Sequence, residues 1–129
     1  VAYSSGNDGD SSARIDLEPG SGLRVNLASF RLGAYSNQTR ATNATIYAIG
    51  EPTPLYTYSG NVGDGSVDST LFDLDLTSAS GIRIEWSNSA ANVGIDQINF
   101  TVTPVPEPSA AALAAAAASA LGVLVRRAR

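Results

Sequence analysis

The chain has 129 residues, and its twelve acidic residues outnumber eight arginines, while lysine, histidine and cysteine are absent. This composition excludes disulfides, thiolate metal sites, zinc sites of the ordinary kind, and catalysis by Ser-His-Asp, Cys-His, Ser-Lys or Schiff-base arrangements. The length suits one small domain, which must be held by its own apolar core or by ions.

Charge is distributed unevenly along the chain. Residues 1–108 contain all twelve acidic residues and five arginines, a formal net charge of −7, and the other three arginines stand at the C-terminus. An acidic surface repels phosphate backbones, so we expect no binding to nucleic acid.

Alternation of apolar and polar residues predicts β-strands throughout residues 1–104. Leu23, Val25 and Leu27 show the pattern, with a polar residue after each of the first two. Turn-forming segments rich in Gly, Asn, Ser and Asp, such as residues 60–65, separate the strands, and no amphipathic helix intervenes. The sequence therefore predicts an all-β fold, an antiparallel β-sandwich of jelly-roll-like type. In chain order, the predicted strands cover residues 13–17, 23–27, 44–49, 54–58, 72–76, 82–86 and 93–102.

Two breaks in the alternation predict local irregularities. In the last strand, the period of two slips by one residue at Asp96 and Gln97, and a β-bulge there would let the apolar residues on both sides, through Phe100, point inward. A similar slip separates Leu27 from Phe30.

The aromatic residues have two alternative roles. Trp86 stands in register with Ile82 and Ile84, which favours a place in the core. Tyr56 and Tyr58 are two residues apart and share a face, so a platform for stacking a sugar ring is the alternative to packing.

Carboxylates are the remaining catalytic candidates, because a pair of them can hydrolyse glycosides. Asp73, Asp75, Glu85 and Asp96 lie on predicted strands, at positions that alternation turns toward solvent. Solubilising charge explains them better than a glycosidase site, so we expect a domain that is not an enzyme, with no catalytic residues.

We expect no cofactor, apart from a structural calcium ion as one alternative. Asp64, Ser66 and Asp68 in one turn, and Asn7, Asp8 and Asp10 in another, would supply the oxygen ligands that calcium prefers. Neither segment matches an EF-hand loop, and turn formation alone also explains both, so no metal ligands are assigned.

The C-terminal 25 residues form three consecutive parts. Residues 105–109 read Val-Pro-Glu-Pro-Ser, residues 110–125 are uncharged and rich in alanine, and Arg126, Arg127 and Arg129 follow. A helix through the uncharged part would be about 25 Å long, close to the lower limit for a transmembrane span. By the positive-inside rule, the arginines favour a cytoplasmic C-terminus and an exported domain at residues 1–104.

This tail resembles the PEP-CTERM sorting signal of exported proteins in Gram-negative bacteria that make exopolysaccharide. The resemblance identifies Val105, Pro106, Glu107, Pro108 and Ser109 as the sorting motif, residues 110–125 as the transmembrane helix, and Arg126, Arg127 and Arg129 as the basic stop. It implies that an exosortase, a membrane-embedded cysteine peptidase, processes the chain. The protein would be anchored in the inner membrane first, and lie at the cell surface or outside the cell after processing.

A second resemblance lies just before the tail. Residues 93–100, Val-Gly-Ile-Asp-Gln-Ile-Asn-Phe, look like the closing strand of galactose-binding-like sandwiches. Together the two resemblances imply a surface or matrix protein that associates with polysaccharide or other envelope components without turnover. The alternative is the C-terminal module of a longer polysaccharide-active enzyme, since the chain begins at Val1 and an N-terminally truncated domain is one interpretation.

Overall fold

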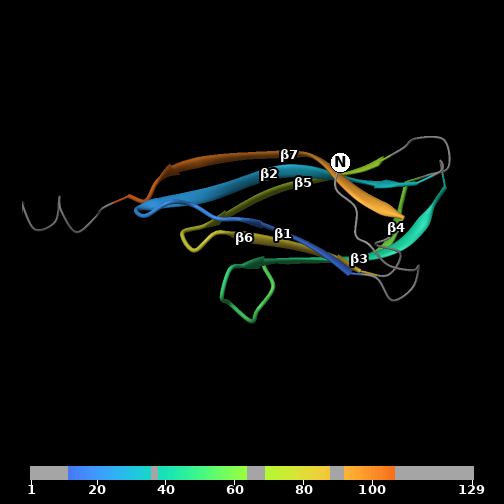
Figure 1. Cartoon of the computed structure of the whole chain (residues 1–129), viewed down its shortest axis with the longest axis horizontal. Helices are drawn as coiled ribbons and strands as arrows, with labels where there is room; N and C mark the ends of the chain where they lie inside the picture. Colours follow the sequence, from blue (N-terminus) through green and yellow to red (C-terminus); the bar gives the residue numbers. More distant parts are fainter. Residues whose placement is uncertain (1–11, 36–37, 64–68, 88–91, 107–129) are drawn as a thin grey trace, which may run out of the picture.

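A computed structural model describes residues 12–35, 38–63, 69–87 and 92–106. Within these ranges the chain forms seven β-strands and no helix, which confirms the all-β prediction (Figure 1). The strands are β1 (Ser12–Leu17), β2 (Leu23–Ala34), β3 (Arg40–Ala48), β4 (Tyr56–Val62), β5 (Ser69–Ser78), β6 (Ile82–Ser87) and β7 (Val93–Pro104).

The strands form two antiparallel sheets that pack as a β-sandwich. Sheet A has three strands in the order β5-β2-β7, and sheet B has four in the order β1-β6-β3-β4. Figure 1 shows sheet A along the top of the molecule and sheet B below it, with β7 and β1 along the near edge. Each strand therefore has one face toward the other sheet and one toward solvent.

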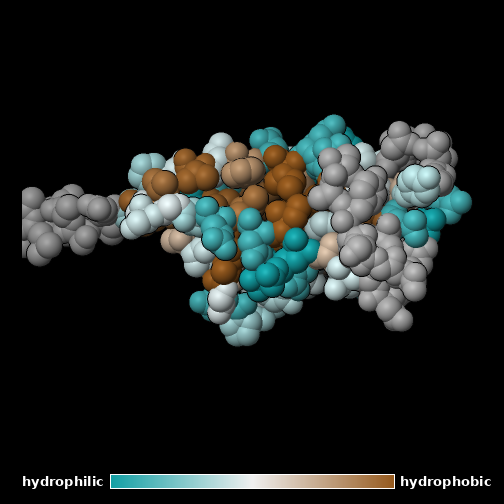
Figure 2. Space-filling model, in the orientation of Figure 1, coloured by the Kyte–Doolittle hydropathy of each residue, from teal (hydrophilic) through white to brown (hydrophobic). Residues whose placement is uncertain are grey.

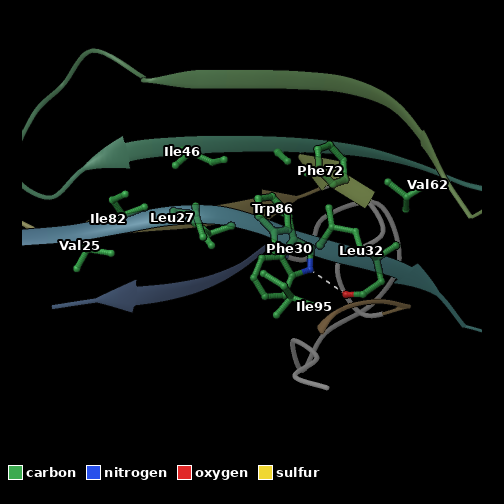
Figure 3. Close-up of a cluster of buried hydrophobic side chains, with 13 residues drawn as sticks. Val25, Leu27, Phe30, Leu32, Ile46, Val62, Phe72, Ile82, Trp86 and Ile95 are labelled. Atoms are coloured by element: carbon green, nitrogen blue, oxygen red, sulfur yellow. Dashed lines mark hydrogen bonds between the residues drawn. The ribbon is translucent and has the colours of Figure 1, made fainter. Parts of the chain in front are cut away.

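The core lies between the sheets and comes from alternate residues of both. Ile82, Ile84 and Trp86 of β6 are at most 2% exposed, as their alternation predicts. The rings of Phe30 and Phe72 stack within sheet A with their centroids 4.9 Å apart. Figure 3 shows these side chains filling the space between the sheets. The other fully or nearly buried apolar residues are Val25, Leu27, Leu32, Ala34, Ala44, Ile46, Val62, Val93 and Ile95.

Both predicted breaks in alternation are present as register shifts. Ser29 and Arg31 pair with Asn99 and Asp96, so β7 has one extra residue between the two pairs, and Gln97 there has a positive φ of 48°. A second shift lies between Leu27 and Ser29, where β2 changes phase. The slip in β2 lets buried residues on both sides of it, Leu27 and Phe30, face the core, and the bulge in β7 turns half-buried Ile98 to the same side as buried Ile95.

Strands β3 and β4 differ from their predicted bounds. β3 begins at Arg40, ahead of the predicted start at residue 44, because buried Thr42 continues the inward-facing row with a polar side chain. β4 begins at Tyr56 and continues to Val62, whereas the sequence pattern placed residues 60–62 in a turn. Val62 is completely buried and pairs with Arg40, so cross-strand pairing extends the strand past the glycine.

The second half of β7 is less buried than predicted. Phe100 and Val102 are 42% and 43% exposed, although they pair with the buried residues Leu27 and Val25 and therefore share the core-facing side of sheet A. Within the described residues, β7 is an edge strand, so nothing in sheet A covers its outer flank. Figure 2 shows apolar residues gathered along this edge, between β7 and β1.

Candidate functional site

The outward face of sheet B carries a polar surface that neighbouring strands build together. The register places Arg14 of β1 opposite Glu85 of β6, and Glu85 opposite Thr45 of β3. These residues project to solvent because their neighbours in each strand point into the core. The adjoining cross-strand row consists of Ser12, Ser87, Asn43 and Ser59.

These two rows surround a hollow of about 330 Å³. Hydroxyl and amide side chains make up half of its lining residues, and the guanidinium of Arg14 and the carboxylate of Glu85 balance each other in charge. Asn43 is held in place by the hydroxyl of Ser59, which donates to its Oδ1 at 2.8 Å. Such a lining offers many hydrogen bonds and little net charge, which suits a polyhydroxylated ligand. The lining residues are Ser12, Ala13, Arg14, Asn43, Thr45, Glu85, Trp86 and Ser87.

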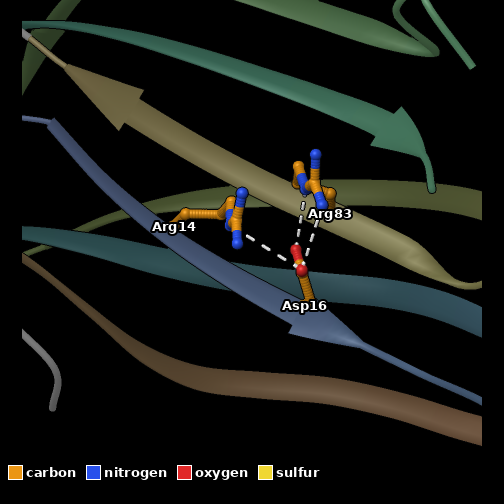
Figure 4. Close-up of polar contacts among 3 residues, drawn as sticks. All are labelled: Arg14, Asp16 and Arg83. Carbon is orange, nitrogen blue, oxygen red and sulfur yellow. Dashed lines mark hydrogen bonds and ion pairs between the residues drawn. The ribbon is translucent and has the colours of Figure 1, made fainter. Parts of the chain in front are cut away.

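An ion pair lies on the same face, one row along the strands. Arg83 donates from Nε and Nη2 to the two carboxylate oxygens of Asp16, at 2.9 and 3.1 Å (Figure 4). Arg14 approaches the same carboxylate, with 3.7 Å between its Nε and Oδ2. The hydrogen bonds from Arg83 lower the pKa of Asp16 below its ordinary value, and the positive charges of both arginines add to this, while partial burial opposes it. The two-point contact fixes both side chains in a planar arrangement.

Tyr47 extends this row on β3, opposite Arg83. Its side chain is half-buried on the outward face of sheet B. An aromatic ring beside a fixed guanidinium and several hydroxyls is a combination that can stack on one face of a sugar and hydrogen-bond its edge.

The four candidate carboxylates do not form one group. Asp73 and Asp75 are exposed on β5 of sheet A, whereas Glu85 lies on the outward face of sheet B. Asp96 accepts a hydrogen bond from the backbone N–H of Gln97 at 2.7 Å, so it supports the bulge of β7. The two outer faces are separated by the core, and carboxylates on opposite faces cannot act on one glycosidic bond.

The aromatic residues of the sequence prediction are all engaged in packing. Trp86 is 2% exposed, which confirms its place in the core. Tyr56 and Tyr58 do share a face, but both meet Phe72 edge-on, with ring centroids 6.5 and 4.9 Å away. The alternative of an open platform at these tyrosines is therefore wrong.

Tyr47, Asp16 and Arg83 were missed by the sequence prediction. Tyr47 alternates with buried Ile46 inside a predicted strand, so its outward direction could have been read from the pattern. The pairing of Asp16 with Arg83 depends on the register between β1 and β6. These strands are 65 or more residues apart in sequence, and no local sequence pattern indicates that they pair.

Several predicted sites lie wholly or partly outside the described residues. Among described residues, no cluster of three or more acidic side chains could hold a metal ion, and the two candidate calcium turns fall outside. Val105 and Pro106 of the predicted sorting motif are described, but Glu107, Pro108, Ser109, residues 110–125 and the three C-terminal arginines are not. In the portion that the structure covers, a helix with the length and apolar character to span a membrane is not found.

The motif begins where the sandwich ends. The backbone N–H of Val105 donates to the carbonyl of Gly22 at 2.9 Å, one residue beyond β7. Pro106 is exposed. No protein-family model matches the chain, and no curated protein is significantly similar to it.

Proposed function

We propose that this chain is an exported, exosortase-sorted surface or matrix protein that binds exopolysaccharide without catalysis. In this proposal, a jelly-roll-type sandwich is followed by a transmembrane helix at residues 110–125, which anchors the protein in the inner membrane until processing. The observation that carries it is the order of the tail: proline box, uncharged stretch and terminal arginines directly follow the last strand.

The described end of the sandwich supports access of a peptidase to the motif. Val105 makes a backbone hydrogen bond to the sandwich, and Pro106 cannot donate one because proline lacks an N–H. The residue before a proline is also disfavoured in helical conformation, so a Pro-Glu-Pro segment favours an extended chain that fits a peptidase cleft.

The proposed ligand follows from the outward face of sheet B. The hydroxyl-lined hollow, Tyr47 and the Asp16–Arg83 pair together offer stacking and hydrogen bonds with balanced charge. A neutral or weakly charged polysaccharide matches this chemistry better than a strongly anionic one, because the domain carries a net negative charge.

Processing is tested by replacing Pro106, Glu107 and Pro108 with alanine in a host that contains an exosortase. The mature protein of this variant should keep the mass of the unprocessed chain, whereas the unmodified protein should be shortened. The matched control replaces Glu51, Pro52 and Pro54, one glutamate and two prolines in the exposed loop between β3 and β4, and should be processed normally. An identical shortened mass for both variants would reject the sorting proposal.

Topology is tested separately with a reporter that is active only in the periplasm. Fused after Arg129 it should be silent, because the three arginines hold the C-terminus in the cytoplasm. Activity at that position would contradict the proposed orientation.

Binding is tested with exopolysaccharide purified from the same host, by retardation of the full chain in native gels that contain it. Tyr47→Ala should weaken the retardation about tenfold or more, since stacking on a base-sized ring is typically worth about 1–3 kcal/mol. Tyr35→Ala is the control, because Tyr35 is 61% exposed at the end of β2 in the other sheet. Reducing sugar released by the wild-type chain but not by folded Glu85→Gln would contradict the non-catalytic proposal.

A further inference from the structure

The outer flank of β7 has unpaired hydrogen-bonding capacity at two positions. The backbone N–H of Val105 donates to the carbonyl of Gly22, so Gly22 and Val105 form a hydrogen-bonded pair. Hydrogen-bonded and non-hydrogen-bonded pairs alternate along an antiparallel ladder. The next hydrogen-bonded pairs are therefore Arg24 with Thr103 and Asn26 with Thr101. Phe100 and Val102 are then in non-hydrogen-bonded pairs with β2. Their backbone N–H and C=O groups point away from β2, toward a side where the described residues place no strand.

The side chains on the same stretch form an apolar surface that is only partly covered. Phe100 and Val102 face the core side of sheet A and are 42% and 43% exposed. On the opposite face, Thr103 is already engaged, since Asn26 donates to its hydroxyl at 2.9 Å and Arg24 at 3.3 Å. What this edge lacks is therefore a strand with an apolar inward face.

Between its bulge and Pro104, this edge lacks the charged side chains that protect many natural edge strands. Residues 97–104 contain no charged side chain. On β5, at the other edge of the same sheet, Asp73 and Asp75 supply charges that oppose pairing with another strand. The bulge at Gln97 and the missing N–H of Pro104 limit the accessible stretch to residues 98–103. A neutral stretch on an acidic domain is where a second copy can approach without opposing like charges.

We propose that β7 is the interface of a homodimer, in which two copies of residues 99–103 pair antiparallel about a two-fold axis through Thr101. In this register Phe100 of each copy lies opposite Val102 of the other, and the outward-pointing backbone groups of both residues form four hydrogen bonds. The axis is perpendicular to the sheet, so the apolar side chains of both copies stay on the core-facing side and cover each other. The two sheets A become one continuous sheet of six strands.

The register is tested with single cysteines, because the natural chain contains none. Thr101 would face its own symmetry mate in a non-hydrogen-bonded pair, with Cα atoms about 4.5 Å apart, which is within the range for a disulfide. Full-length Thr101→Cys should therefore become a covalent dimer on mild oxidation with copper-phenanthroline.

Thr103→Cys is the matched control on the same strand and face. Its two copies would lie four residues apart along the strand, about 14 Å, and should cross-link at least tenfold more slowly. Equal cross-linking of the two variants, or none of Thr101→Cys, would overturn the proposed register.

Association itself is measured by light scattering of the full chain in mild detergent. Wild type should have the mass of a dimer, and Val102→Lys should be monomeric because it sets a charge against Phe100 of the other copy. Leu71→Lys, at a residue 49% exposed on β5, is the control and should remain dimeric. Circular dichroism of each variant checks that the sandwich is intact. A monomeric wild type, or a Val102→Lys dimer held by the tail, would overturn the proposal.

Discussion

The indole N–H of Trp86 donates to the backbone carbonyl of Val93 at 2.8 Å, and this buried hydrogen bond joins β6 of sheet B to the start of β7 in sheet A (Figure 3). Both residues are almost inaccessible to water, so the carbonyl has no replacement partner if the indole is removed. The bond fixes how the two sheets are aligned at this end of the sandwich.

Trp86→Phe should therefore destabilise the protein by about 2–4 kcal/mol, from an unsatisfied carbonyl and lost packing. Because Trp86 is the sole tryptophan, urea unfolding must be followed by circular dichroism. Tyr47→Phe is the control, since it removes one hydroxyl from the outward face of sheet B and should change stability by about 0.5 kcal/mol or less. A loss equal to that of the control would mean that the hydrogen bond contributes nothing.

Ile84→Ala tests the core prediction. Ile84 is completely buried in the core cluster, and its truncation should cost about 2–4 kcal/mol through lost burial and a residual cavity. Asp73→Ala, on the solvent side of β5, should cost about 0.5 kcal/mol or less. Similar midpoints for the two variants in urea would contradict the assignment of inward and outward faces.

The pair formed by Asp16 and Arg83 predicts a loss of stability in acid. The hydrogen bonds from Arg83 hold the pKa of Asp16 below its ordinary value of 3.8, so the stabilisation is fully present above that value and is lost as pH falls through the lower folded pKa. Asp16→Asn and Arg83→Gln should each flatten the dependence of unfolding free energy on pH below about 4. If a variant loses stability in acid as steeply as wild type, groups other than Asp16 control the acid dependence of stability.

Alanine substitutions at two turn glycines distinguish the cost of backbone strain from the cost of steric crowding. Gly50 and Gly81 have positive φ values of 87° and 102°, so alanine at either position is strained. A Cβ at Gly50 would meet nothing within 4 Å, whereas at Gly81 it would lie 2.6 Å from the carbonyl oxygen of Leu17. Gly50→Ala should cost about 1–2 kcal/mol, and Gly81→Ala should cost clearly more, as measured by thermal unfolding. Equal costs would mean that the backbone near Gly81 yields without penalty.

Local periodicity predicted the fold class and the buried faces well. The alternation of Ile82, Ile84 and Trp86 marks a half-buried strand, and the phase slip at Asp96 and Gln97 marks the bulge, because both follow from neighbours in sequence. Burial of Phe100 was predicted too strongly, since alternation gives the face of a strand but not its place at the edge of a sheet.

The candidate site could be predicted only in fragments. Asp16 and Arg83 meet because β1 pairs with β6, and Asn43 meets Ser59 because β3 pairs with β4. Such partnerships arise from packing over long sequence separations, and single-sequence patterns do not encode them. The predicted sorting motif, by contrast, is contiguous in sequence and needs no such pairing to be proposed.

The length of the pairing between β2 and β7 has a mechanical consequence. The chain leaves the sandwich after β7, and ten residue pairs join that strand to β2, the longest pairing within the described residues. A pull on the tail along the strand axis loads these pairs in parallel, so they resist together as a shear joint. A sideways pull instead opens the bond between Val105 and Gly22 first and then peels the strand pair by pair. The resistance of the domain to force on its tail thus depends on the direction of the pull.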